Sequence, residues 1–585
     1  MVSVRAGLVG AAVWGGAAAG ALGAANDSDW DLARRVGANH EALRTGHGRA
    51  RLKEIETLAT VAGAQDEYNV LHYTIDIDVD PGIFSRDIDG SCDILLTPTG
   101  AELYQVVLDL DWRMKVSAVF DGEGLPLSYG HHLDVLTVEL APTLMPGEEA
   151  TIRVEYGGSP LTNFFGFDIW RLRPTPVVYT LCEPNGSRTW WPCKDHPSDK
   201  ATVDLIITMP QRYTVASNGL LEAVMSNDEG TLSHHWSTRY PLAPYLVAFT
   251  ATNFVLIEDS YELSEGGTLP LLYYTWPEDV EDAEQDVASI PGMLSVFEDE
   301  WFGYPFPEEK YGHMETPLVT GAMEHTTMTS YGQLLYTGTG YFDYVAAHEL
   351  AHHWWGDLVT CGTWDDIWLN EGFATYAEAI YHEALTGFGG YLEYMRAIER
   401  PRFYGPIHAP NRVLNTTVYD KGAWVLHMLR GIVGRDILMG ILRTWGTRFA
   451  HESPVTSDFT AVAAEVAGQD LDWFFDPWLY EIGRPEYEYG LRVRPIMEDR
   501  SWIDLQLEQV QGGVNPYTMP ITLRAHLEGG EHVDVVVENG ATKEAFSFLI
   551  DGVVEEVEID PESFVLAEFR EREWVPNLRV DVSRR

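Results

Sequence analysis

The chain has 585 residues, of which 45% are hydrophobic and 12% aromatic. This composition excludes a disordered protein, and the length suits three or four domains rather than one hydrophobic core. Asp and Glu number 89 against 39 Lys and Arg, a formal net charge of −50. Such a surface repels nucleic acids and anionic membranes, so we expect neither as a partner.

The N-terminal segment has Arg5, then a run of Ala, Gly, Val and Leu as far as Ala25, then the polar residues 26–29. A positive region, an apolar region and small residues in this order are typical of a secretory signal peptide. We therefore expect residues 1–25 to be a signal and the protein to be secreted or periplasmic. An N-terminal membrane anchor is the alternative. Residues 26–66 are expected to form a linker or leader.

From Tyr68 the chain alternates apolar and polar residues, which predicts a half-buried strand over residues 68–79. Similar short runs follow, separated by turns rich in Gly, Pro and Asp, at residues 92–96, 106–110, 133–140, 151–155, 202–209 and 245–250. We expect an all-β N-terminal domain over residues 67–265. Within it, Cys182 and Cys193 could pair in an oxidising compartment, whereas Cys92 and Cys361 are expected to be buried thiols.

Helical spacing replaces the strand pattern further along, at residues 277–302, 341–358, 371–385, 389–399, 421–431 and 434–446. Residues 311–333 are expected to be extended, so residues 266–485 are predicted to form an α+β domain. Strand patterns return at residues 503–507, 519–527, 533–537, 546–550 and 554–559. They predict a small β-sandwich domain over residues 486–585. The expected fold class is therefore multidomain, with an all-β, an α+β and a β-sandwich part.

The segment His348-Glu349-Leu350-Ala351-His352 lies within the predicted helix over residues 341–358. A helix turns about 100° per residue, so positions i and i+4 differ by only about 40° and project from the same face. His348 and His352 can therefore offer two imidazole nitrogens to one metal ion, with Glu349 beside them. A core helix with incidental histidines is the alternative.

Glu371 is the candidate third ligand. It lies 19 residues after His352 (371 − 352 = 19), in Asn370-Glu371-Gly372-Phe373 at the start of the next predicted helix. Two histidines and one glutamate leave the fourth position of a tetrahedral zinc site open, which is typical of catalytic rather than structural zinc. We expect one Zn²⁺ ion held by His348, His352 and Glu371.

These residues resemble the gluzincin aminopeptidases, the group that includes aminopeptidase N and leukotriene hydrolase. Three further segments match that family in order. Residues 321–325, Gly-Ala-Met-Glu-His, resemble its exopeptidase motif, and residues 419–423, Tyr-Asp-Lys-Gly-Ala, resemble the segment with its catalytic tyrosine. Glu183, followed by Trp191-Pro192-Cys193-Lys194-Asp195 and Lys200-Ala201-Thr202, is similar to its N-domain segment that reaches the active site.

The resemblance covers roughly residues 65–485. It implies a thermolysin-like catalytic domain in a bacterial-type member without the long helical C-terminal domain of many relatives. The implied activity is that of a zinc aminopeptidase, which hydrolyses N-terminal residues from peptides with a metal-activated water. Glu349 would be the general base, and Tyr419 would donate a hydrogen bond to the developing oxyanion.

Two carboxylates are expected to select the peptide N-terminus. By the resemblance, Glu324 and Glu183 would bind the free ammonium group of a peptide substrate, since a buried cation needs paired charge. The substrate would also contact Gly321, Ala322, Met323 and His325. The sequence departs from the family where His325 stands in place of the usual Asn and Leu181 in place of a Gln.

Other activities use the same residue pattern. A zinc endopeptidase or a lipid-epoxide hydrolase would keep the metal ligands, although Glu324 disfavours an endopeptidase. A non-catalytic peptide-binding module on this scaffold would have lost ligands or the general base, and all of these residues are present.

Overall fold

The structure is a computed structural model that describes residues 63–82, 85–160, 166–228, 230–319, 321–497, 499–512 and 515–575. The predicted signal over residues 1–25, and the predicted linker up to residue 62, lie outside these residues. Among the described helices, none is both long enough and apolar enough to cross a membrane. The chain divides into two compact units. One extends to Trp364 and includes Phe449–Pro454, and the other comprises Asp365–Arg448 and Val455–Arg585.

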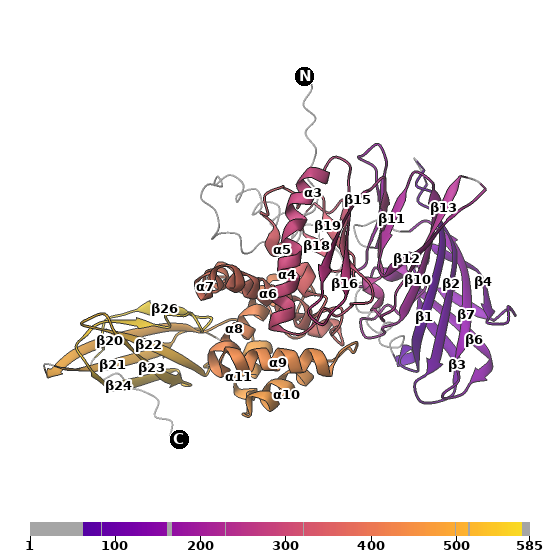
Figure 1. The fold of residues 1–585 in the computed structure, drawn as a ribbon. Helices are drawn as coiled ribbons and strands as arrows, with labels where there is room; N and C mark the ends of the chain where they lie inside the picture. The colour runs from indigo at the N-terminus through magenta and orange to yellow at the C-terminus, as the bar shows by residue number, and fades with distance from the viewer. Residues whose placement is uncertain are drawn as a thin grey trace, which may run out of the picture. The chain divides into compact units, whose positions relative to one another are not determined.

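A seven-stranded sheet is the largest element of the first unit (Figure 1). Its strands, in spatial order, are β12 (Leu220–Ser226), β13 (Thr231–Ser237), β10 (Thr202–Pro210), β1 (Tyr68–Val79), β2 (Ile88–Pro98), β7 (Ala150–Gly158) and β4 (Met114–Asp121). In β1, Tyr73, Ile75 and Ile77 alternate with more exposed residues, because successive side chains of a strand point to opposite faces. The alternation seen in the sequence therefore corresponds to one face packed into a core.

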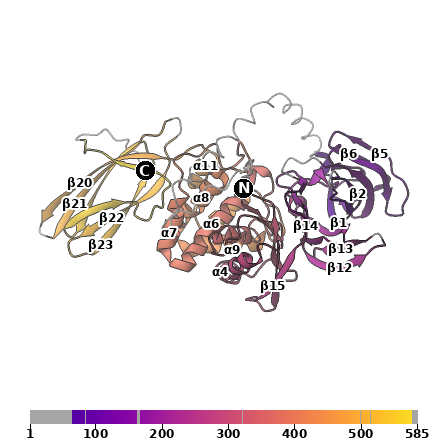
Figure 2. The same ribbon diagram turned by 90° about the horizontal axis from the view of Figure 1, so that it is seen from above.

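Two smaller sheets complete this β-rich region (Figure 2). One contains β3 (Leu103–Asp109), β6 (Val135–Leu144) and β5 (Tyr129–His132). The other contains β11 (Thr214–Ser217), β14 (Phe249–Thr252), β9 (Val177–Leu181) and β8 (Gly166–Trp170). Their apolar faces share one hydrophobic core with the large sheet, which includes Trp190, Trp191 and Trp236.

A five-stranded sheet and three helices form the remainder of the first unit. The sheet order is β15 (Val255–Glu262), β16 (Thr268–Thr275), β17 (Tyr311–Thr316), β19 (Thr329–Gly332) and β18 (Ala322–Met323). Beside it lie α3 (Val280–Asp286), α4 (Ile290–Glu300) and α5 (Asp343–Ala351), as Figure 1 shows. Mixed strand directions, with β16–β17 and β17–β19 parallel, give the α+β character predicted from the sequence.

The second unit begins with a group of helices. They are α6 (Trp368–Thr386), α7 (Phe388–Ala397), α8 (Gly422–Val433), α9 (Arg435–Arg448), α10 (Thr456–Ala467) and α11 (Asp472–Leu479). A π-helical turn, η5 (Thr417–Lys421), leads directly into α8. Side chains such as Trp368, Phe459 and Phe475 form the aromatic core of this group.

The C-terminal region is β-rich and has two sheets. One contains β24 (Lys543–Asp551), β21 (Arg500–Gln509), β20 (Glu486–Met497) and β26 (Glu568–Glu571), and the other β23 (His532–Asn539), β22 (Met519–Leu527) and β25 (Val554–Ile559). Residues of both sheets, among them Ile503, Ala525 and Ile550, share a small core. The predicted fold class is thereby confirmed.

Three local predictions were wrong in extent. The helix predicted over residues 341–358 ends at Ala351, where the backbone turns and Trp354 and Trp355 pack on Trp301. The helix predicted over residues 277–302 is divided into α3 and α4 by a 3₁₀ turn. In the strand predicted over residues 245–250, Pro244–Leu246 is a 3₁₀ turn and the strand starts at Phe249. In each case a turn interrupts or shortens the continuous element that was predicted.

The cysteines form no disulfide. Cys92, Cys182, Cys193 and Cys361 are all buried thiols, so the pairing considered for Cys182 and Cys193 is absent. The Cys182 sulfur instead accepts a hydrogen bond from Trp190 Nε1 at 3.4 Å.

A buried ion group holds the segment that follows Glu183. Arg188 Nε lies 2.7 Å from Asp195 Oδ2, and Arg188 Nη1 lies 3.1 Å from Asp109 Oδ1. Both carboxyl groups are buried, and burial raises the pKa of Asp195 while Arg188 opposes that rise. Arg188 therefore compensates two carboxyl groups that water does not solvate.

We predict that Arg188→Met destabilises the fold, because it leaves Asp109 and Asp195 buried without their cation. The free energy of unfolding, measured by urea titration with tryptophan fluorescence, should fall by about 3–5 kcal/mol. The exposed Arg239–Glu308 pair of the same unit is the control, and Arg239→Met should cost under about 1 kcal/mol. Equal losses for the two variants would contradict the prediction.

Candidate metal and substrate site

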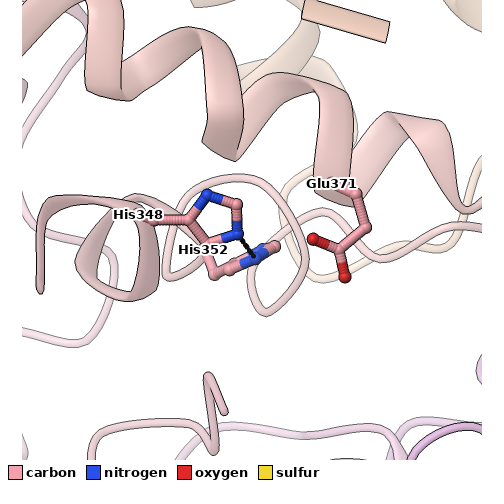
Figure 3. Close-up of side chains that lie close together, drawn as sticks. All are labelled: His348, His352 and Glu371. Atoms are coloured by element: carbon pink, nitrogen blue, oxygen red, sulfur yellow. Dashed lines mark hydrogen bonds between the residues drawn. The ribbon is translucent and has the colours of Figure 1, made fainter. Parts of the chain in front are cut away.

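His348 lies on α5, and His352 directly follows the last residue of that helix, so the two histidines lie one helical turn apart. Their Nε2 atoms lie 3.0 Å apart (Figure 3). His352 Nδ1 lies 2.9 Å from the Trp355 carbonyl oxygen, which only accepts hydrogen bonds, so this ring nitrogen carries the proton. When this ring is neutral, its Nε2 therefore has the free electron pair that a metal ion requires.

Glu371 lies in the first turn of α6 and completes a group of three possible ligands. The ligand atoms of His348, His352 and Glu371 all lie within 4.8 Å of one another, and all three residues are buried. Figure 3 shows the Glu371 carboxylate directed toward the two imidazole rings. The sequence prediction that these residues come together agrees with this geometry.

The donor set fits a zinc ion. Zinc–nitrogen bonds of about 2.0–2.1 Å in tetrahedral geometry place two nitrogen ligands roughly 3.3–3.4 Å apart. The observed 3.0 Å between the two Nε2 atoms is close to that value. Two neutral imidazoles and one carboxylate are also a common zinc ligand set, which leaves one coordination position open.

A cluster of three carboxylates lies next to the His348–His352–Glu371 group. Carboxylate oxygens of Glu183, Glu324 and Glu371 lie within 4.8 Å of one another, and each residue is at most 5% exposed. Glu183 follows β9, and Glu324 follows β18. Glu371 thus belongs to both groups. Burial raises the pKa of the Tyr245 phenol, and the negative charge of Glu324 raises it further.

The short strand β18 places the Gly321–His325 segment. Ala322 and Met323 pair with Tyr331 and Ser330 of β19. His325 Nδ1 lies 2.8 Å from Ser330 Oγ, and burial lowers the pKa of His325 to about 3. The imidazole at this unusual position is therefore neutral and tied to β19.

The turn after Glu324 is attached to the segment just beyond α5 by a residue that the sequence did not single out as functional. The Thr327 backbone N–H donates to His353 Nε2 at 2.9 Å. His353 is buried among the rings of Tyr304, Phe306 and Tyr311. Its position beside His352 was the only signal in the sequence.

The half-buried Lys200 holds the chain beyond α5. Lys200 Nζ donates to the carbonyl oxygens of Asp357 and Leu358, at 2.9 and 2.8 Å. Burial lowers the pKa of Lys200 to about 7. The Lys200-Ala201-Thr202 match in the sequence thus corresponds to a contact with the segment that follows the two histidines.

The remaining predicted residues, Glu349 and Tyr419, are also buried. Glu349 lies on α5 directly after His348. Tyr419 lies on the π-turn η5, where Arg400 Nε donates to the neighbouring Asp420 at 2.6 Å. Burial raises the pKa of Asp420 to about 7, and Arg400 opposes the rise.

Comparison with known proteins agrees with this geometry. Residues 69–246 match the family described as "Peptidase M1 N-terminal domain", and residues 288–478 match "Peptidase family M1 domain". Human endoplasmic reticulum aminopeptidase 1 is 27% identical over 362 residues, which cover 57% of this chain and 38% of the relative. Bovine glutamyl aminopeptidase is 29% identical over 336 residues, 53% of this chain and 34% of the relative. The chain therefore spans well under half the length of these relatives.

Solved structures give the same assignment. The M1 zinc metallopeptidase from Deinococcus radiodurans superposes with a TM-score of 0.62 at 26% identity, covering 71% of this chain and 94% of that one. A Legionella pneumophila aminopeptidase A in complex with aspartic acid has a TM-score of 0.75 at 19% identity, covering 87% of this chain and 60% of that one, and supports the fold. With both domains matched in order around this ligand set, the chain belongs to the M1 family of zinc metallopeptidases.

Proposed function

We propose that the protein is a zinc aminopeptidase that releases N-terminal residues from peptides. The observation that carries this proposal is the carboxylate group of Glu183, Glu324 and Glu371, which adjoins the two histidines through a shared residue. A metal site alone suits any zinc hydrolase. Additional buried carboxylates next to the metal site favour a positively charged substrate, because its charge compensates theirs.

His348, His352 and Glu371 would hold the zinc ion. A zinc ion bound there supplies Lewis-acid polarisation of the scissile carbonyl and lowers the pKa of a water toward about 7. Glu349, one residue from His348, would take the proton of the attacking water. It would return that proton to the departing amine nitrogen as the carbon–nitrogen bond breaks.

Tyr419 would act on the carbonyl oxygen. As water adds to the carbonyl carbon, negative charge develops on this oxygen, and the phenol O–H would donate a hydrogen bond to it. Such a donor contributes most when it is held in place before the reaction, within a site shielded from water. Tyr419 is only 6% exposed, which agrees with that requirement.

Glu183 and Glu324 would accept hydrogen bonds from the substrate ammonium group. This pairing would set the distance from the N-terminus to the scissile bond, so that only the first peptide bond reaches Glu349. Relatives support the proposal: a D. radiodurans M1 zinc metallopeptidase mutant has been solved bound to a Tyr-Ser-Ala substrate. An acetylated N-terminus lacks the charge and should not bind in this way.

The experiment that tests the function compares aminoacyl-nitroanilides with their N-acetylated counterparts, with and without a zinc chelator. Free-amine substrates should be cleaved, chelator should abolish the cleavage, and added zinc should restore it. Equal cleavage of acetylated substrates would instead indicate an endopeptidase. A zinc-loaded protein that cleaves neither substrate would leave the peptidase proposal without support.

We predict that Glu324→Gln removes most of the preference for a free amine. Because the amide keeps the shape and loses the charge, kcat/KM for free-amine substrates should fall about 10²-fold, equivalent to roughly 3 kcal/mol. Glu308→Gln, at an exposed carboxylate of the same unit, is the control and should change kcat/KM by less than about twofold. Unchanged discrimination in Glu324→Gln would contradict the ammonium role.

For Tyr419→Phe we predict a loss of about 10²–10³-fold in kcat with little change in KM, since the hydrogen bond forms fully only in the transition state. The control is Tyr404→Phe. The Tyr404 side chain is 74% exposed, and its backbone bonds to Thr417 at the start of the same turn. Should both variants retain wild-type kcat, Tyr419 would have no part in the reaction.

A further inference from the structure

The two segments that carry Glu371 and Tyr419 touch through their backbones. Gly372 follows Glu371 in α6, and Gly422 begins α8, directly after the turn that contains Tyr419. A Cβ atom added to Gly372 would lie 2.9 Å from Gly422 Cα and 3.2 Å from the Val418 carbonyl oxygen. A Cβ added to Gly422 would lie 2.9 Å from Gly372 Cα. No residue with a side chain fits at either position without a backbone shift.

Local backbone preference does not explain these glycines. Gly422 has φ −57° and ψ −50°, which any residue adopts in a helix. Glycine is about 1 kcal/mol less favourable than alanine in a helix interior. Gly372, inside α6, therefore weakens its own helix, and the close contact between the two segments is the compensating feature.

The turn that carries Tyr419 is itself unusual. Thr417–Lys421 is a π-turn, a rare conformation that is found mostly at functional sites. It is anchored on one side by the Arg400–Asp420 ion pair and by hydrogen bonds between Thr417 and the Tyr404 backbone. On its other side, the Val418 carbonyl and Gly422 contact α6 at Gly372.

We propose that Gly372 and Gly422 are positioning residues, whose contact sets the separation between Glu371 and Tyr419. The inference rests on the proposed function, in which Glu371 holds the metal ion and Tyr419 donates to the developing oxyanion. Neither glycine touches the substrate. Carbon atoms pack at about 3.5–4.0 Å, so a Cβ at 2.9 Å would separate the segments by roughly 0.5–1 Å. Displacements of about 1 Å in an active site cost on the order of 10²-fold in rate.

The test is Gly422→Ala, with Gly440→Ala as the matched control. Gly440 lies inside α9 of the same unit, and a Cβ there would meet only Val466 Cγ1, at an ordinary 3.6 Å. We expect Gly422→Ala to lower kcat about 10²-fold with KM within about threefold, whereas Gly440→Ala stays within twofold of the wild type. Thermal unfolding followed by circular dichroism confirms that each variant is folded.

Two further readouts separate positioning from a general structural effect. Zinc affinity, measured by competition with a chromophoric chelator, should stay within about threefold in Gly422→Ala, because this residue lies on the Tyr419 side of the contact. In a double-mutant cycle, adding Gly422→Ala to Tyr419→Phe should lower kcat by less than about threefold, since the hydroxyl it would misplace is already absent. A purely structural effect would lower kcat equally in both backgrounds.

Wild-type kcat in Gly422→Ala, or independent effects in the cycle, would overturn the inference. If Gly422→Ala does not fold, Gly372→Ala is used as the test variant instead, because it disturbs the same contact from the other side. Failure of both to fold, with Gly440→Ala folded, would make the contact purely structural and also overturn the inference. A wild-type protein that cleaves no free-amine substrate would instead contradict the proposed function.

Discussion

The burial of negative charge is the constraint on which the site depends. Four buried glutamates, each at most 5% exposed, lie in this region: Glu183, Glu324, Glu349 and Glu371. Glu371 belongs both to the group with the two histidines and to the group with Glu183 and Glu324. Moving a carboxylate out of water costs several kcal/mol unless positive charge and hydrogen bonds compensate it. In the proposed enzyme, the metal ion and the substrate ammonium both bring positive charge. The arrangement would therefore favour a zinc-loaded protein and a substrate with a free amine.

Hydrogen bonds to the backbone fix the chain around α5. The helix ends at Ala351, and the segment beyond it is held by Lys200, whose ammonium group donates to two carbonyl oxygens. His353 accepts a hydrogen bond from the backbone N–H of Thr327, so the turn after Glu324 is attached to the same segment. Side chains that hold a catalytic geometry must themselves be held, and here hydrogen bonds to backbone groups do so.

Prediction from the sequence succeeded where a short-range pattern determines structure. The alternation in residues 68–79 corresponds to β1, and the i, i+4 spacing of His348 and His352 brings their nitrogens together. It failed where packing redirects the chain. Trp354 and Trp355 continue an apolar helical pattern, yet they pack on Trp301 after the helix has ended. The π-turn at Tyr419 also has no pattern of its own, since its residues are compatible with an ordinary helix.

The sequence by itself determined the ligand types, their spacing on α5 and the order of the family motifs, because these depend on residue identity and on local helix geometry. Only the tertiary structure decided that Glu183 and Glu324 meet at Glu371, and that Gly372 and Gly422 bring two helical segments into backbone contact. Such contacts join residues far apart in the chain. They depend on the summed packing of many side chains, which no local pattern records.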